Sequence, residues 1–366
     1  MSLSVGIVGL PNVGKSTLFN ALTKNSVPME NYPFCTIDPS VGVVAVPDSR
    51  LATLSEISGS EEILPAIIEF VDIAGLVKGA SAGEGLGNKF LANIRETDMI
   101  AEVVRIFEDS DIHHVSGSVD PMGDIETINL ELIMADAETV SKRLSNLERD
   151  VKRGDKEAVA EKALLEKIAG HLQAGHLANS LGITDEEKKI LKGLHLLTMK
   201  QFLYVCNKKQ DAFNLDEHND DRWQELLNFF EDTGSEYVMV DAGMEHELKD
   251  LGDDEKNEFR REYGAQDSGV ETLIRACYHR LGLMSYFTTG EKETRAWTVP
   301  IGSTGPEAGA AIHTDFQTKY IRAQVVKFED LVSAGSKSAA RDQGKLRTEG
   351  KEYIVQDGDV IEFMHS

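Results

Sequence analysis

A short segment near the amino terminus restricts the possible fold of this chain more than any other feature. The residues Gly9-Leu-Pro-Asn-Val-Gly14-Lys15-Ser16 fit the pattern G-x-x-x-x-G-K-[ST], which joins a buried β-strand to an α-helix in nucleotide-binding proteins. The context agrees, because an apolar stretch at 5–9 precedes the pattern and a helix-forming stretch at 15–24 follows it. The glycines let backbone N–H groups surround phosphate oxygens, and the helix N-terminus adds the positive end of its dipole. The sequence therefore predicts a P-loop.

Each residue type in this loop predicts a separate role. Lys15 is expected to reach the β- and γ-phosphates and to act in catalysis, and the Ser16 hydroxyl is expected to bind Mg²⁺. The other predicted phosphate-binding residues are Gly9, Asn12, Val13, Gly14 and Thr17.

Two further segments have the spacing of nucleotide switches. Asp72-Ile-Ala-Gly75 directly follows a β-branched, apolar stretch at 66–71, so Asp72 is expected to hold a Mg²⁺-bound water and the Gly75 N–H to sense the γ-phosphate. Thr36 lies between the P-loop helix and the next strand and is the expected additional Mg²⁺ ligand. Four glycines within 79–87 favour a loop that the γ-phosphate could order, and an ordinary flexible loop is the alternative.

The arrangement of apolar stretches predicts an α/β fold with an insertion. Strand-like runs at 41–46, 66–71, 100–107 and 202–206 alternate with helices, which is typical of a doubly wound, mostly parallel sheet. In between, Ile133, Val140 and Leu147 repeat every seven residues, with Ala137, Leu144 and Val151 four residues after each. This heptad pattern, broken at 153–155 and followed by Leu165, Ile168 and Leu172, predicts an antiparallel helical hairpin. Two ordinary packing helices are the alternative.

The carboxy-terminal segment has a different pattern. Strands are expected at 297–301, 321–326, 353–355 and 360–363, a helix at 328–334, and a turn at 356–359. The resulting domain prediction is a nucleotide-binding domain at 1–126 and 199–282, a helical insertion at 127–198, and a β-rich domain at 283–366.

These motifs together resemble a known family. The segments Gly-Leu-Pro-Asn-Val-Gly-Lys-Ser-Thr, Asn-Tyr-Pro-Phe-Cys-Thr-Ile and Asp-Ile-Ala-Gly-Leu-Val-Lys-Gly-Ala, and the run 117–129, are similar to the Obg-like ATPase (YchF) family of translation-factor-class GTPases. The resemblance covers essentially the whole chain. It implies a G domain, an inserted coiled coil, a C-terminal ubiquitin-like β-grasp (TGS) domain, nucleotide hydrolysis and ribosome association.

The base-binding segment departs from the usual guanine pattern. Guanine-specific proteins use Asn-Lys-x-Asp after a buried strand, whereas this chain has Asn207-Lys208-Lys209-Gln210 after its strand at 202–206. A neutral glutamine cannot make the charge-assisted bidentate contact of an aspartate. The family is known for Asn-x-x-Glu there and for accepting ATP, and Gln210 differs from both patterns. We therefore expect ATP to be preferred over GTP, with Asn207 and Lys208 contacting the base, and a solvent-facing Gln210 is the alternative.

The residue that would orient the attacking water is also unusual. Ras-type enzymes have a glutamine directly after Asp-x-x-Gly, and here that position is Leu76. His114 matches the histidine of the family's His-Val-x-Gly segment and is the catalytic candidate, with a structural histidine as the alternative. Asn12 matches an asparagine that holds K⁺ in some related GTPases. Cys35 is expected to be a buried, inert thiol rather than a redox sensor.

The composition limits the partners and the cellular setting. The chain has 62 acidic and 38 basic residues, a net charge of −24, which repels nucleic acid except where basic residues gather. One such island, 319–351, has eight Lys or Arg against four acids and predicts RNA contact, with a solvated surface as the alternative. Three cysteines, no secretory signal and no apolar run of about 20 residues predict a cytoplasmic protein without membrane contact. Nothing in the sequence requires more than a monomer.

The motifs predict a Mg²⁺-dependent nucleoside-triphosphatase switch, and the family resemblance implies that it binds the ribosome. Two alternatives keep the nucleotide site, namely a GTP-preferring GTPase and a nucleotide-loaded scaffold with incidental hydrolysis. A P-loop kinase is a third possibility, but the arginine-rich lid of such kinases is not evident in the sequence.

Overall fold

The computed structural model describes residues 3–23, 38, 40–73, 86–110, 118–248, 251–252, 255–256, 258–259 and 268–365. Its central element is a six-stranded sheet in the order β2-β4-β1-β5-β7-β9. All neighbouring pairs are parallel except β2, which runs antiparallel to β4, so the predicted mostly parallel sheet is confirmed. The strands are β1 (Ser4–Val8), β2 (Val41–Ala45), β4 (Ile67–Asp72), β5 (Met99–Arg105), β7 (Gln201–Asn207) and β9 (Tyr237–Val240).

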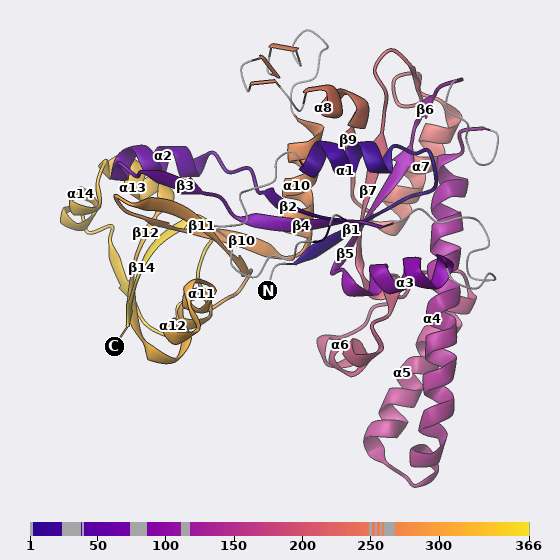
Figure 1. The fold of residues 1–366 in the computed structure, drawn as a ribbon. Helices are drawn as coiled ribbons and strands as arrows, with labels where there is room; N and C mark the ends of the chain where they lie inside the picture. Colours follow the sequence, from indigo (N-terminus) through magenta and orange to yellow (C-terminus); the bar gives the residue numbers. More distant parts are fainter. Residues whose placement is uncertain are drawn as a thin grey trace.

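Helices pack on this sheet and complete the nucleotide-binding domain (Figure 1). The P-loop helix α1 packs against α8 and α10, whereas α4 packs on β5 and against α7. Every residue of β5 is buried, as expected of a central strand with both faces covered. The helices are α1 (Lys15–Thr23), α3 (Leu86–Glu96), α7 (Asp221–Thr233), α8 (Ala242–Leu248) and α10 (Gly269–Arg280), and a small β6 (Phe107–Glu108) pairs with β8 (Phe213–Asn214).

The predicted helical hairpin is present and projects away from the sheet (Figure 1). Its helices are α4 (Pro121–Lys152) and α5 (Lys156–Gln173), followed by η3 (Ala178–Ser180), α6 (Asp185–Leu191), η4 (Lys192–Leu194) and η5 (Leu197–Met199). The heptad residues Ile133, Val140 and Leu147 lie in its core with Leu165 and Ile168.

The helix begins before the predicted boundary at residue 127. Asp120 caps α4 by accepting a hydrogen bond from the Gly123 N–H at 3.0 Å, and Pro121 occupies the first turn. The first turns belong to the core of the central sheet through Ile125 and Ile128, so the predicted boundary falls inside a continuous helix.

The carboxy-terminal domain begins at Leu283 and forms a second six-stranded sheet in the order β13-β12-β14-β10-β11-β3. A β10–β11 hairpin, with β14 parallel to β10 and antiparallel to β12, gives the predicted ubiquitin-like order. The predicted strand at 353–355 is wrong, because Ile354 forms only an isolated bridge with Thr304. The elements are β10 (Leu283–Thr289), β11 (Glu293–Pro300), α11 (Gly305–Ile312), α12 (Thr314–Lys319), β12 (Tyr320–Lys327), α13 (Phe328–Ala334), α14 (Lys337–Asp342), β13 (Arg347–Glu349) and β14 (Asp359–His365).

The sixth strand of this second sheet comes from the amino-terminal half of the chain. The connection between β2 and β4 carries α2 (Arg50–Ser58) and β3 (Glu62–Leu64), and β3 pairs in parallel with β11. Both elements lie among the carboxy-terminal strands and helices, away from the central sheet (Figure 1). The predicted domain at 1–126 therefore contributes a strand and a helix to its neighbour.

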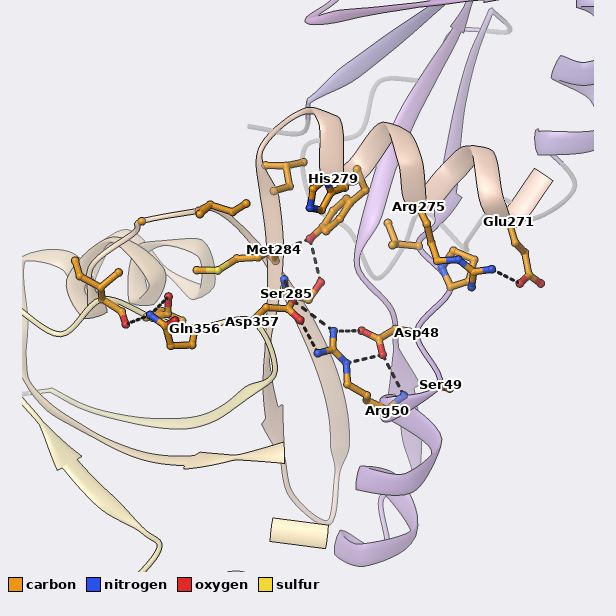
Figure 2. Close-up of a pocket in the computed structure, with 18 residues that line it drawn as sticks. Asp48, Ser49, Arg50, Glu271, Arg275, His279, Met284, Ser285, Gln356 and Asp357 are labelled. Carbon is orange, nitrogen blue, oxygen red and sulfur yellow. Dashed lines mark hydrogen bonds and ion pairs between the residues drawn. The ribbon is translucent and has the colours of Figure 1, made fainter. Parts of the chain in front are cut away.

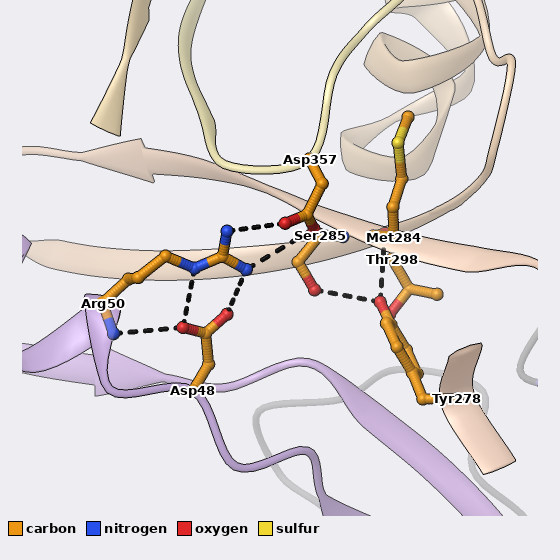
Figure 3. Close-up of polar contacts among 7 residues, drawn as sticks. All are labelled: Asp48, Arg50, Tyr278, Met284, Ser285, Thr298 and Asp357. Atoms are coloured by element: carbon orange, nitrogen blue, oxygen red, sulfur yellow. Dashed lines mark hydrogen bonds and ion pairs between the residues drawn. The ribbon is translucent and has the colours of Figure 1, made fainter. Parts of the chain in front are cut away.

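Side-chain contacts fasten this connection to the carboxy-terminal domain. The Arg50 guanidinium donates to Asp48 and, at 2.7 Å, to Asp357 in the turn before β14, while the Ser285 N–H donates to the same Asp357 carboxylate at 3.0 Å (Figure 3). A cavity of about 960 Å³ lies at the joint, between α10, the segment 46–50 and the turn at 354–357 (Figure 2). Within the described ranges, no helix combines the length and the apolar character needed to cross a membrane.

Candidate functional site

The loop between β1 and α1 has the backbone conformation that the motif predicts. Gly14 has φ of 97° and Asn12 has φ of 67°, the left-handed region that turns successive N–H groups toward one side. At Gly9 a Cβ atom would lie 2.9 Å from the Val103 carbonyl oxygen and 2.9 Å from Val13 Cγ2. Only glycine therefore fits there, and the loop lies tightly against β5.

The P-loop lysine and the switch aspartate contact each other directly. Lys15 is the first residue of α1 and only 9% exposed, and its ammonium group forms an ion pair with the Asp72 carboxylate at the end of β4. The Asp72 side chain is 26% exposed, so solvent reaches one side of the ion pair. Ser16 is exposed and Thr17 half-buried. The structure thus brings together two predicted site residues from distant parts of the sequence, Lys15 and Asp72.

Asn207 holds the base-binding segment against the P-loop. It ends β7 and is 3% exposed. Its Nδ2 donates to the Val13 carbonyl oxygen at 2.8 Å, and its Oδ1 accepts from the Ala242 N–H at 3.0 Å. Gly14 allows this close approach, because a Cβ there would lie 2.1 Å from Asn207 Nδ2. Both the nitrogen and the oxygen of the Asn207 amide are hydrogen-bonded within the protein. Asn207 therefore holds the segment in place, whereas we expected its side chain to contact the base.

The two lysines after Asn207 are also engaged. The Lys208 ammonium group pairs with Asp216 at 3.1 Å and with Glu217, and Lys209 pairs with Asp109. Ion pairs with carboxylates fix the lysine stems along the edge of the site and reduce the positive charge that they present to a ligand.

Asp241 is a residue of this site that the sequence prediction missed. It follows β9 directly, and its carboxylate accepts from the Gln210 N–H at 2.6 Å and from the Met244 N–H at 2.9 Å. Burial is the largest effect on its carboxyl and raises the pKa of Asp241 above the usual value, while the backbone hydrogen bonds act in the opposite direction. A carboxylate at the end of a parallel strand was the available signal, since ligands bind at the carboxyl ends of such strands.

Several predicted site residues lie outside the described residues. These are Thr36 and Gly75, the catalytic candidate His114, the water-site position Leu76, and Cys35. Their roles stay predictions.

The basic island of the carboxy-terminal domain is more neutral locally than its sequence suggests. Lys319 pairs with Asp315 at 3.0 Å, and Lys345 with Asp330 at 3.3 Å. Ion pairs also join Lys337 to Glu362 and Arg347 to Glu349. Such surface pairs weaken the field that would attract RNA phosphates, so RNA contact by this surface stays a prediction.

Two family models match this chain. The model named MMR_HSR1, described as "50S ribosome-binding GTPase", matches residues 4–135. The model named YchF-GTPase_C, described as "Protein of unknown function (DUF933)", matches residues 283–366. The second match coincides with the domain that begins at β10.

Curated proteins and one solved structure are similar over essentially the full length. Proteins named "Ribosome-binding ATPase YchF" from Bacillus subtilis and from Haemophilus influenzae are each 50% identical to this chain over 363 residues, covering 99% of both chains in each comparison. The structure of the Schizosaccharomyces pombe YchF GTPase superposes with a TM-score of 0.88 at 36% identity, covering 99% of this chain and 98% of that one. These relatives are named for different nucleotides, the bacterial proteins as ATPases and the yeast protein as a GTPase.

Proposed function

The chain belongs to the YchF family, and from this premise we propose that it is a Mg²⁺-dependent nucleoside triphosphatase that prefers ATP to GTP and acts on the ribosome. The observation that carries the proposal is the P-loop geometry, in which Gly9 and Gly14 shape the loop and Lys15 begins the helix that follows. Backbone N–H groups and a helix N-terminus in this arrangement form a binding site for a polyanion.

Lys15 and Asp72 would exchange partners when nucleotide binds. In the structure the ammonium and the carboxylate neutralise each other. A triphosphate offers the ammonium group several anionic oxygens, and the Asp72 carboxylate is then released toward the metal position. Lys15 can in this way hold the β- and γ-phosphates while negative charge shifts toward the leaving group.

The residues at the site fit a magnesium ion. The exposed Ser16 hydroxyl would bind Mg²⁺ together with phosphate oxygens, and the partly exposed Asp72 carboxylate would hold a Mg²⁺-bound water. Thr36 would add a further hydroxyl. When bound, the ion supplies charge neutralisation at the phosphates. Asn12, held at positive φ inside the loop, is the proposed contact for K⁺, and His114 is the proposed group that orients the attacking water.

The ribosome is the proposed partner because the bacterial relatives are named ribosome-binding. The helical hairpin and the carboxy-terminal domain are the surfaces that we propose for this contact. They project on different sides of the nucleotide-binding domain (Figure 1), so the protein could contact two separate ribosomal sites.

Hydrolysis assays and calorimetry test the proposal. The purified chain should hydrolyse ATP faster than GTP in Mg²⁺ and K⁺ buffer, and ribosomes should accelerate the reaction. Lys15→Ala should abolish hydrolysis of both nucleotides, whereas Lys292→Ala, an exposed lysine in the β10–β11 turn, should not change it. Titrations with ATP, GTP, ADP and GDP measure the base preference directly. Faster hydrolysis of GTP would contradict the adenine preference, and hydrolysis that ribosomes leave unchanged would favour a nucleotide-loaded scaffold.

A further inference from the structure

We propose that strands β2 and β4 couple the nucleotide site to the carboxy-terminal domain, so that a bound triphosphate strengthens the attachment of β3 to β11. This inference rests on the proposed function, because it needs a nucleotide at the P-loop. The two strands form one antiparallel ribbon, paired from Val41 opposite Val71 to Ala45 opposite Ile67. One end of the ribbon lies at the nucleotide site, and the chain continues from the other end into α2 and β3 (Figure 1).

The near end of the ribbon is formed by Asp72 and Ser40. Asp72 ends β4, and its carboxylate forms the ion pair with Lys15. Its backbone N–H donates to the Ser40 carbonyl oxygen at 2.8 Å. Ser40 is held in turn by Asp38, whose Oδ1 accepts from the Ser40 N–H at 2.9 Å and from the Ser40 hydroxyl at 2.6 Å. A change of partner at Asp72 therefore acts directly on the residue that leads into β2.

The strand that can transmit a displacement is β2. In the described part of the sheet β4 has strand neighbours on both sides, β1 and β2, whereas β2 lies at the edge and pairs with β4 alone. The pairing continues past the strand ends, because the Val46 N–H donates to the Ala66 carbonyl oxygen at 2.8 Å. At about 3.3 Å per residue, the five residues of β2 span about 17 Å. A displacement at Ser40 is therefore carried along the strand toward α2.

The far end of the ribbon is built into the carboxy-terminal sheet. α2 packs on β10, β11 and α13, and β3 pairs in parallel with β11. The Glu61 N–H donates to the Glu291 carbonyl oxygen at 3.0 Å, and the Ser60 hydroxyl donates to the Gly290 carbonyl oxygen at 2.7 Å. The segment that follows β2 is therefore fixed to the carboxy-terminal domain.

A cluster of hydroxyl groups makes this attachment specific. Thr294 on β11 is 0% exposed, and its Oγ1 lies 2.7 Å from Ser60 Oγ and 2.6 Å from Thr289 Oγ1. Thr289 on β10 also donates to Ser58 Oγ, at the end of α2, at 2.8 Å. Thr294 is the central member of this cluster, so loss of its hydroxyl removes a hydrogen-bond partner from both Ser60 and Thr289.

Nucleotide binding changes the near end of the ribbon. When Lys15 moves to the phosphates, the Asp72 carboxylate turns to the metal-bound water, which favours one arrangement of Asp72 and of its contact with Ser40. A ligand that restricts one end of a hydrogen-bonded ribbon also restricts the other end, and this coupling is reciprocal. A bound triphosphate should therefore make opening of the β3–β11 pair rarer. Loss of the Thr294 hydroxyl should disconnect the carboxy-terminal domain from the nucleotide.

Amide hydrogen exchange of the full chain, measured by mass spectrometry, tests this coupling. Exchange is compared with and without non-hydrolysable analogues of ATP and of GTP in Mg²⁺ buffer. The analogue that protects the P-loop peptide, residues 9–17, should also slow exchange at residues 58–66 and 289–296, by about fivefold.

Thr294→Val keeps the shape of the side chain but removes the hydroxyl. It should abolish the slowing at 58–66 and 289–296, while the slowing at the P-loop persists. Thr294→Ser keeps the hydroxyl and should respond as wild type does. Thr318→Val is the matched control in the same domain, because Thr318 is exposed on α12 and donates only locally, to the Asp315 carbonyl oxygen at 3.3 Å. It should leave both responses unchanged.

The outcomes separate this coupling from the proposed function. If neither analogue slows exchange at the P-loop, the proposed function fails and the coupling fails with it. If the P-loop responds but residues 58–66 and 289–296 do not, the coupling is refuted and the proposed function stands. A wild-type response in Thr294→Val also refutes the coupling. If thermal unfolding shows that Thr294→Val does not fold, Ser60→Ala replaces it with the same expected loss, and a wild-type response in Ser60→Ala then refutes the proposal.

Discussion

Glu102 is a carboxyl group in the centre of the sheet whose burial should make the stability of the protein depend on pH. It lies on β5, is 0% exposed, and neither of its carboxyl oxygens has a hydrogen-bond partner among the residues that the structure describes. Burial, reinforced by the nearby negative charge of Asp124, raises the pKa of Glu102 well above its usual value of 4.5. The group is therefore protonated in the folded protein at pH values where it is ionised in the unfolded chain.

The sign and size of the effect follow from proton linkage. Between about pH 4.5, the value for an unperturbed glutamate, and the raised pKa in the fold, the folded state binds one more proton than the unfolded state. The free energy of unfolding then falls as pH rises, by about 1.4 kcal/mol for each pH unit. Glu102→Gln has no proton to lose, so its stability advantage over wild type should grow by about 3 kcal/mol over two pH units within this interval.

Urea denaturation followed by tryptophan fluorescence measures this difference. The chain has two tryptophans, Trp223 in the core of the central sheet and Trp297 on β11. A Trp297→Phe background therefore leaves one reporter in the same core as β5. The midpoints for wild type and Glu102→Gln should separate progressively as the pH increases from 5.

Asp124 provides the control for the electrostatic part of the argument. Asp124 lies in the first turn of α4 and is 5% exposed. Asp124→Asn removes a negative charge next to Glu102, so the pKa of Glu102 should fall and the loss of stability should stop at a lower pH. A difference between Glu102→Gln and wild type that is constant with pH would refute the reasoning, because it would mean that Glu102 ionises alike in both states.

Two further predictions concern contacts between parts of the chain that are distant in sequence. Asp136 is fully buried and accepts from the Leu197 N–H at 3.0 Å and from the Thr198 N–H at 2.7 Å. Asp136→Ala should therefore lower the free energy of unfolding, measured by urea titration, by about 2–4 kcal/mol. A loss below about 1 kcal/mol would contradict this prediction. Arg50→Lys cannot keep the forked contacts with Asp48 and Asp357 and should lower the stability at the joint by about 1 kcal/mol, measured by Trp297 fluorescence, with no change in nucleotide affinity.

The parts of the site that depend on local chemistry could be predicted from the sequence. Glycine conformations and the lysine at the start of α1 are properties of consecutive residues, so the P-loop was predicted correctly. The helical hairpin was predicted from its heptads, because a seven-residue repeat is a local signal. The predicted start of α4 was wrong, although Asp120 and Pro121 are typical of a helix beginning. The prediction rested on the heptad repeat, which begins only at Ile133, after the first turns of the helix.

Contacts between distant segments could not be predicted. β3 has only three residues, too few for a recognisable period, and its partner β11 lies some 230 residues further along the chain. Asp241 acts on a turn that precedes it by about thirty residues, so no local pattern joins the two. The error at 353–355 has a related cause, since a β-branched pair there forms only one bridge and only the neighbouring strands decide whether a ladder continues.

The position of α2 and β3 in the carboxy-terminal domain has a consequence for the synthesis of the chain. On the ribosome, residues 50–64 emerge before β10, β11 and α13, which are the elements of the carboxy-terminal domain that contact α2. The face of α2 that packs on them therefore lacks these partners until residues 283–334 have been synthesised. A chain truncated before residue 283 lacks β10, β11 and α13, and a fragment that starts at residue 283 lacks β3, the strand that pairs with β11. Completion of the second sheet therefore needs segments from both halves of the chain, and β14 follows all the other strands of that sheet in the sequence.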